Sequence, residues 1–186
     1  MNFEYLLEQL KVNIFLPKED SPTKLPDKAG AYVICVKCIE DLPLKMKELE
    51  FLYINELPVI YVGIAGRPTS KVKSLRKRDY KNHFNGKART STLRKSIGVL
   101  FELERRYLHK ENKSKYSFIP EHEEKLSLWM KDNLVMHYIS IENPMDFEKY
   151  LINVFEPPLN LKNNNDENNK DFRKELYNLR NHTQIK

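Results

Sequence analysis

The chain has 186 residues and a mass of 22.2 kDa, the size of one compact domain with short extensions. Its 40% hydrophobic and 11% aromatic content can form a sizeable core and excludes disorder throughout. No apolar run approaches the roughly 18 residues of a membrane span, and the N-terminal residues lack the pattern of a signal peptide, so we expect a cytoplasmic protein without a membrane partner.

The net charge of +6 is distributed unevenly. From Arg67 to Lys95 there are eleven basic residues and one acid, a net of +10 that leaves −4 for the rest of the chain. Such a segment favours polyanion binding, because each cation that neutralises a phosphate releases counterions, although a solvated helix face would carry the same charges. The predicted nucleic-acid contacts are Arg67, Lys71, Lys73, Arg76, Lys77, Lys81, Lys87, Arg89 and Arg94.

The N-terminal third predicts a helix and then strands. Apolar residues recur at helical spacing over 3–12, and a proline-rich connector follows as far as residue 27. Residues 30–39 and 59–65 have strand character, so we expect an antiparallel pair, with a third strand around 51–54.

The only two cysteines fall near the end of the first predicted strand. Alternation along a strand would put the thiols of Cys35 and Cys38 on opposite faces, and no second pair completes a zinc site. We therefore interpret them as ordinary strand cysteines.

The remainder of the chain predicts mainly helices. Ser74 is a candidate N-cap and Gly86 a candidate stop for the first of them. In chain order we expect helices over residues 74–84, 90–100 and 121–132, a strand over 134–141, a helix from Asn143-Pro144 to Pro157-Pro158, and a short, loosely attached helix over 171–182. The corresponding domain prediction is an N-terminal helix and connector over 1–27, a main domain over 28–162 with an insertion at about 102–140, and a polar tail over 163–186.

Several short motifs follow one another on these elements. Gly30-Ala31-Tyr32 opens the first strand and Tyr61-Val62-Gly63 lies in the second. Arg78 lies in the helix predicted over residues 74–84, the basic helix, and Glu148 and Asn160 follow, 12 residues apart. In this order they resemble the GIY-YIG nuclease family over roughly residues 28–162. The resemblance implies an α+β fold in which helices flank a small three-stranded antiparallel sheet.

Phosphodiester hydrolysis needs an activated water, a cation and stabilisation of charge on the phosphate oxygens. Glu148 offers a hard oxygen ligand for Mg²⁺ or Mn²⁺, and Arg78 offers a planar fork for phosphate. A phenol of pKa about 10 is a poor base unless nearby cations lower that pKa, and the basic segment contains such cations. The resemblance implies that Tyr61 is the base, that Tyr32 supports it and that Asn160 is a structural anchor.

The chain departs from the family pattern at two positions. Some members have a histidine or tyrosine four residues after the arginine, whereas here His83 comes at five, and we expect it still to reach the phosphate. Ile64 stands where some members have an activating lysine, and Lys71 or Lys73 is the candidate substitute. Arg76 is the local competitor for the role of Arg78.

The leading functional prediction is a Mg²⁺-dependent DNA endonuclease, a stand-alone restriction or invader-defence enzyme. The alternatives are a structure-specific repair or recombination nuclease and a non-catalytic nucleic-acid-binding protein that retains the fold. RNA stays open as a substrate, because phosphate contacts do not read the sugar. Double-strand cleavage at a palindrome would imply a homodimer.

Overall fold

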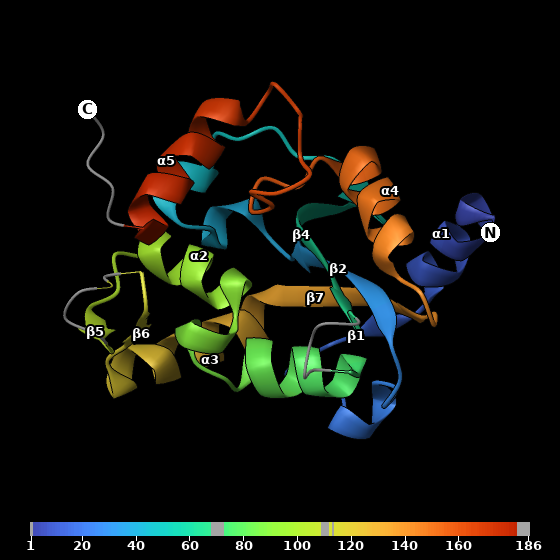
Figure 1. Ribbon diagram of the computed structural model, residues 1–186, viewed down its shortest axis with the longest axis horizontal. Coiled ribbons are helices and arrows are strands. Elements are labelled where there is room, and N and C mark those ends of the chain that lie inside the picture. Colours follow the sequence, from blue (N-terminus) through green and yellow to red (C-terminus); the bar gives the residue numbers. More distant parts are fainter. Residues whose placement is uncertain (1, 68–72, 109–111, 113, 182–186) are drawn as a thin grey trace.

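The structure, a computed structural model, describes residues 2–67, 73–108, 112 and 114–181 and has an α+β architecture (Figure 1). Its centre is a five-stranded antiparallel sheet with the order β1-β7-β2-β4-β3. Within the described residues, no helix is both long and apolar enough to span a bilayer. The strands of the sheet are β1 (Ile14–Phe15), β2 (Gly30–Val36), β3 (Tyr53–Ile54), β4 (Leu57–Ala65) and β7 (Leu134–Ser140).

The prediction of a three-stranded sheet is wrong in the number of strands, because the sheet has five. The three long strands β7, β2 and β4 form the centre, and the two-residue strands β1 and β3 add one edge each. Two residues are too few to show alternation, so the β1 pairing of Ile14 and Phe15 with β7 leaves no pattern in the sequence. The strand β7, predicted over 134–141, falls within the predicted insertion at about 102–140 and belongs to the central sheet.

The sheet is covered on both faces. Along β2 the alternation is regular: Tyr32 and Ile34 pack into one apolar cluster, and Ala31 and Val33 into the other. Residues of α2, α3, α5 and the basic helix share the first cluster, whereas α1 and α4 share the second. The helices are α1 (Phe3–Val12), α2 (Thr92–Leu100), α3 (Pro120–Asn133), α4 (Met145–Phe155) and α5 (Lys170–Asn181), with short 3₁₀ turns at Pro22–Lys24, Ile39–Asp41, Leu44–Met46 and Ala88–Thr90.

The basic helix is present as predicted, but most of it is a π-helix. After Leu75 and Arg76, residues Lys77–Phe84 form a π-helix, whose wider turn is closed at its end by the amide of Asn85 donating to the carbonyl of Tyr80 at 3.1 Å. Runs of this type are rare and are frequently found at functional sites. Residues five apart therefore lie about one turn apart along this segment.

A β-bulge interrupts the pairing of β2 with β4. Ile34 pairs with Tyr61 and Cys35 pairs with Val59, so Ile60 is an extra residue on β4. The carbonyl of Ile60 instead accepts a hydrogen bond from the amide of Leu159 at 3.1 Å. The bulge thus joins β4 to the segment that follows α4.

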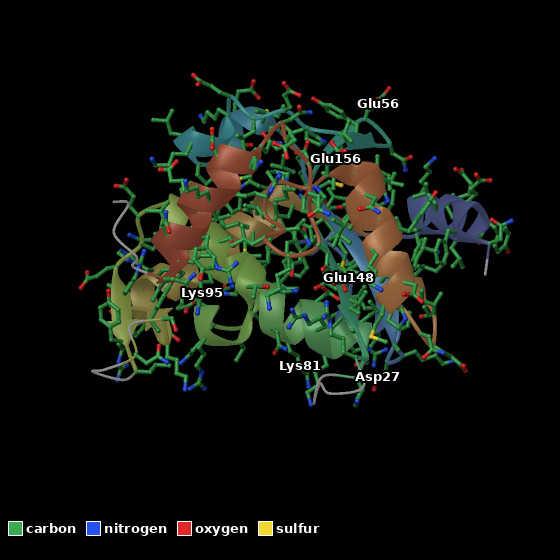
Figure 2. All side chains as sticks on the ribbon, turned by 45° about the horizontal axis from the view of Figure 1, so that its top comes forward. Asp27, Glu56, Lys81, Lys95, Glu148 and Glu156 are labelled. Carbon is green, nitrogen blue, oxygen red and sulfur yellow. The ribbon has the colours of Figure 1, made fainter. Side chains whose placement is uncertain are left out.

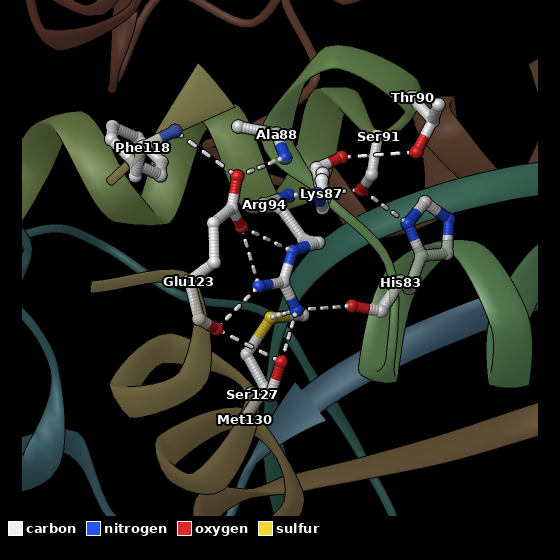
Figure 3. A network of polar contacts seen from close by, with 10 residues as sticks. All are labelled: His83, Lys87, Ala88, Thr90, Ser91, Arg94, Phe118, Glu123, Ser127 and Met130. Atoms are coloured by element: carbon white, nitrogen blue, oxygen red, sulfur yellow. Dashed lines mark hydrogen bonds and ion pairs between the residues drawn. The ribbon is translucent and has the colours of Figure 1, made fainter. Parts of the chain in front are cut away.

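The segment between α2 and β7 forms a hairpin, β5 (Arg105–Tyr107) with β6 (Tyr116–Phe118), followed by α3. Glu123 of α3 holds it against α2, because its carboxylate pairs with Arg94 at 2.7 Å and accepts from the amide of Ala88 at 2.8 Å (Figure 3). Arg94 is fully buried and also donates to the carbonyl of His83 at 2.9 Å. The prediction that Arg94 contacts nucleic acid is therefore wrong, because its guanidinium is buried in this network.

The C-terminal helix α5 is more firmly attached than predicted. Leu176 is fully buried in the core, and Figure 1 shows α5 lying against α2. Arg173 pairs with Asp166 at 3.1 Å, and the carbonyl of Leu179 accepts from Arg105 of β5 at 2.9 Å. Contacts at both ends of the helix therefore hold it in place.

Candidate active site

One cavity of about 470 Å³ gathers four of the six predicted catalytic residues, namely Tyr61, Arg78, Glu148 and Asn160. It opens beside β4 and is bounded by side chains of the basic helix, α2, α4, α5 and the segment after α4. Its charged and polar lining residues are Tyr61, Arg67, Arg78, Thr92, Glu148, Asn160, Lys162, Asn163, Tyr177, Arg180 and Asn181. Side chains far apart in the sequence therefore meet at one place.

Tyr61 presents its phenol to this cavity. Its side chain is only 8% exposed, and its hydroxyl forms a 3.1 Å hydrogen bond with that of Thr92, the first residue of α2. The sequence prediction assigned no role to Thr92. It directly follows the N-cap Ser91 of α2, and its side chain lines the cavity. This pairing orients the phenol group of Tyr61.

Tyr32 lies beneath the cavity and does not line it. The side chain is fully buried, its hydroxyl lies 2.7 Å from Nε2 of His83, and it accepts a 3.3 Å hydrogen bond from Nε of Arg78. Burial raises the pKa of Tyr32 well above its usual value, an effect that Arg78 only partly offsets. Tyr32 is therefore a neutral phenol that connects Arg78 to His83.

His83 is fully buried, so the expectation that it reaches the phosphate is wrong for this arrangement. Its Nδ1 lies 2.5 Å from the hydroxyl of Ser91, and burial, with Arg78 and Arg94 nearby, lowers its pKa well below the usual value. The five-residue spacing from Arg78 is nevertheless accommodated, because one π-helical turn brings both side chains to the hydroxyl of Tyr32.

The structure separates the two candidate arginines of the basic helix. Arg78 lines the cavity, and the phenol of Tyr32 raises its pKa, so the guanidinium is charged at any working pH. Arg76 points elsewhere and donates to the backbone carbonyls of Leu25 at 2.9 Å and Thr23 at 3.3 Å. Arg76 therefore fastens the N-terminal connector, and Arg78 is the arginine available to a substrate.

Glu148 extends from the first turn of α4 into the cavity, on the side of the helix that faces the body of the molecule (Figure 2). Its side chain is 9% exposed and pairs with Arg67, whose Nη2 lies 2.7 and 2.5 Å from the two carboxylate oxygens. Burial raises the pKa of Glu148, and Arg67 and Arg78 partly offset that rise. A partly desolvated carboxylate among cations has the properties of a metal ligand or an anion-site counter-charge.

The donor set fits a divalent cation held by one protein carboxylate. Glu148 is the one carboxylate among the described residues that line the cavity, and no cluster of three or more metal-ligating side chains occurs in the described ranges. Mg²⁺ is commonly bound through one or two carboxylates while it keeps several waters. Arg67 would have to release at least one oxygen of Glu148, and its half-exposed side chain has room to turn outward.

Asn160 joins the segment after α4 to β4. Its side-chain amide accepts from the backbone amide of Val62 at 2.8 Å and donates to the carbonyl of the same residue at 2.9 Å. The contact lies between Tyr61 and Gly63, so Asn160 positions the strand segment that carries the phenol.

The remaining predicted phosphate contacts divide by exposure. Lys73, Lys77, Lys81, Lys87 and Arg89 are exposed, as is Arg67 in its pair with Glu148. Lys71 lies outside the described residues, so its suggested role as an activating lysine is a prediction that the structure does not address.

Two further features were not predicted. Asp79 is fully buried, and burial raises the pKa of its carboxyl well above the usual value; neither of its oxygens has a hydrogen-bond partner among the described residues. The helix α5 supplies Tyr177, Arg180 and Asn181 to the cavity. The apolar spacing of Phe172, Leu176 and Leu179 on α5 was the available signal that this helix packs on the core.

Comparison with known proteins gives one match. The family model described as the GIY-YIG catalytic domain matches residues 30–182, which takes in the sheet from β2 onward and all of α5. No curated protein and no solved structure matches the chain.

Proposed function

This chain belongs to the GIY-YIG catalytic-domain family, and we propose on that basis that it is a metal-dependent endonuclease that hydrolyses DNA phosphodiester bonds. The observation that most supports the proposal is the convergence of Tyr61, Arg78 and Glu148 on one cavity. A nucleophile activator, a phosphate clamp and a carboxylate for a cation are the groups that this hydrolysis needs.

In this mechanism Tyr61, acting as the phenolate, accepts the proton of the attacking water and becomes the neutral phenol. Its hydroxyl faces the cavity and is oriented by Thr92, and Arg67 and Arg78 line the same space. A basic oxygen held within reach of the attacking water is what general-base catalysis requires.

Arg78 binds the scissile phosphate. Its guanidinium can donate two parallel hydrogen bonds to non-bridging oxygens, whose charge grows as the water attacks. Because Nε of Arg78 is already bonded to the hydroxyl of Tyr32, the fork is held in position before substrate arrives. Tyr32 and His83 are therefore positioning residues that act through Arg78.

Glu148 would hold the divalent cation, with water completing the coordination. Bound there, Mg²⁺ would supply positive charge to the phosphate and to the departing 3′ oxygen. Arg67 would then be free to contact the DNA backbone.

The test is conversion of supercoiled plasmid to nicked or linear DNA in Mg²⁺ or Mn²⁺, with EDTA as the negative control. Glu148→Gln should keep the fold and DNA binding but lose cleavage, because the isosteric amide is a much poorer ligand for Mg²⁺. The matched control is Asp146→Asn, which removes an exposed carboxylate from the same helix and should cleave normally. Wild-type cleavage rates in Glu148→Gln would disprove the metal assignment.

Sequence-specific cleavage, as in a restriction or invader-defence nuclease, is the finer form of this proposal. Sequencing of the ends after digestion of mixed DNA distinguishes it from other nuclease roles, since random ends would contradict it. A parallel digestion of RNA of the same sequence tests the choice of sugar, which phosphate contacts do not read.

A further inference from the structure

The wall of the cavity that α5 supplies is held in place from several directions. Leu176 is fully buried, Arg173 is paired with Asp166, and the carbonyl of Leu179 accepts from Arg105. The side chains of Tyr177 and Arg180, one helical turn apart, therefore face the cavity from a fixed support. None of the motifs that indicate the family lies on this helix.

Arg180, which is half-buried, differs in its partners from the two buried arginines of this region. Arg94 is paired with Glu123 and Arg173 with Asp166. By contrast, Nε of Arg180 is buried and has no hydrogen-bond acceptor in the described part of the chain. Burial lowers the pKa of Arg180, and the groups that act in the other direction are the phenols of Tyr116 and Tyr61, not a carboxylate.

A buried donor without an acceptor is unfavourable, since the free energy of its lost hydration is not recovered. Such a group is explained when a ligand supplies the acceptor. The charges around the cavity indicate the sign of that ligand: the described lining includes the cations Arg67, Arg78, Lys162 and Arg180, against the single anion Glu148. The cavity is therefore suited to an anion with several acceptor oxygens.

We propose that Arg180 is a second substrate-binding arginine of the active site and that it contacts a phosphate of the nucleic-acid strand held between α5 and β4. The inference rests on the proposed nuclease function, and it assigns α5 to the substrate-binding surface. Arg78 clamps the scissile phosphate, whereas Arg180 holds the same strand from the opposite wall. That contact is the same in the bound substrate and in the transition state. Its loss should therefore weaken DNA binding more than it lowers the cleavage rate of the bound complex.

The experiment measures binding of a fluorescent DNA duplex to the full chain in EDTA, where cleavage is prevented, at several salt concentrations. Arg180→Met, which keeps the apolar stem, should raise Kd on the order of 10-fold and reduce the slope of log Kd against log salt by about 0.9. Arg180→Lys should keep the slope and recover part of the affinity, because it restores the charge but not the fork. The matched control is Lys174→Met on the exposed side of α5, which should bind as wild type does.

Thermal unfolding separates this role from a structural one. Since Nε of Arg180 has no acceptor in the described residues, Arg180→Met should unfold at the wild-type temperature or above it. Wild-type affinity and salt slope in Arg180→Met would overturn the proposal, as would a lowered unfolding temperature that Arg180→Lys restores together with binding. A wild-type chain that binds DNA without cleaving it would refute the nuclease function, while the Arg180 measurements would still decide this inference.

Discussion

At the scale of single residues, the buried hydroxyl of Tyr32 connects the two sides of the candidate site. It accepts from Arg78 and lies 2.7 Å from His83, and His83 in turn lies 2.5 Å from Ser91 at the N-cap of α2. In the tautomer with its proton on Nδ1, neutral His83 accepts from Tyr32 and donates to Ser91. The network thus links the basic helix, β2 and α2 beneath the cavity.

The first prediction separates Arg78 from Arg76. Arg78→Ala should reduce the cleavage rate at saturating enzyme by about 10²-fold or more, comparable to the loss of a preorganised charge stabiliser, and Arg78→Lys should remain impaired. Arg76→Ala should instead lower the free energy of unfolding by about 1–2 kcal/mol, because it removes the hydrogen bonds to the carbonyls of Leu25 and Thr23. Single-turnover cleavage and denaturant unfolding measure the two effects. Normal cleavage by Arg78→Ala would remove it from the mechanism.

The second prediction concerns the buried carboxyl of Asp79. Its pKa is higher in the folded than in the unfolded protein, where the usual value is 3.8, so its contribution to stability is complete below that value and is lost as pH rises. Asp79→Asn removes this loss, and the variant should gain stability over wild type by up to about 1.4 kcal/mol per pH unit above pH 4 until the folded carboxyl ionises.

Denaturant unfolding of both proteins between pH 4 and pH 8 measures this difference. His83 acts in the opposite direction, because its lowered pKa makes stability fall as pH drops below the usual value of 6.5. Because Nε2 of His83 lies 3.7 Å from Oδ1 of Asp79, the two titrations are coupled, so the Asp79 effect is read above pH 6.5, where His83 is neutral in both proteins. A constant difference at every pH would mean that the Asp79 carboxyl is ionised in the folded protein.

At the scale of elements, two irregularities position the site. The π-helix makes residues five apart neighbours, which brings Arg78 and His83 to one hydroxyl. The bulge at Ile60 frees a carbonyl for Leu159, next to the strand segment that Asn160 holds. Both irregularities lie beside the cavity, where such features are commonly found.

The third prediction tests the pairing of β2 with β4. Gly63 lies directly opposite Tyr32, and a Cβ atom there would lie 2.4 Å from the phenol oxygen and 2.5 Å from Cζ. Gly63→Ala must therefore displace the ring or the strand, which we expect to cost about 1–3 kcal/mol of stability and to slow cleavage at least tenfold. The cost in stability should shrink in a Tyr32→Leu background, measured as a double-mutant cycle. Equal costs in both backgrounds would show that the ring is not the obstacle.

At the scale of the whole molecule, the basic segment has two roles. The exposed side chains Lys77, Lys81, Lys87 and Arg89 are available to a phosphate backbone. Arg94 instead joins α2 to α3 through Glu123. The charge count along the sequence is the same for both groups, and only burial distinguishes them.

The fourth prediction uses this difference. Arg89→Ala should weaken DNA binding and reduce the slope of log Kd against log salt by about 0.9, with little change in stability. Arg94→Ala should lower the free energy of unfolding by about 3–5 kcal/mol, because the buried carboxylate of Glu123 would lose its ion-pair partner and keep only hydrogen bonds from backbone amides. Binding titrations at several salt concentrations and denaturant unfolding measure the two effects. A reduced salt slope for a folded Arg94→Ala protein would show that Arg94 does reach DNA.

The sequence by itself indicated the family, the long strands and the positions of most helices. Regular alternation on β2 and helical spacing on α4 are local patterns, and each is repeated often enough to be recognised. The order of the motifs from Gly30 to Asn160 carried the family resemblance, which the match over residues 30–182 confirms. The same order of motifs pointed to Tyr61, Arg78 and Glu148 as candidate site residues, and all three side chains line one cavity.

Tertiary structure decided the contacts that depend on which distant side chains meet. Arg94 is buried because α3 brings Glu123 to it from 29 residues away, and the role of α5 depends on its packing against α2. The edge strand β1 is two residues long, was not predicted, and forms only because the longer strand β7 is beside it. Local sequence encodes backbone preference and amphipathic spacing, whereas burial and pairing of charges are properties of contacts between segments, and these exist only once the chain has folded.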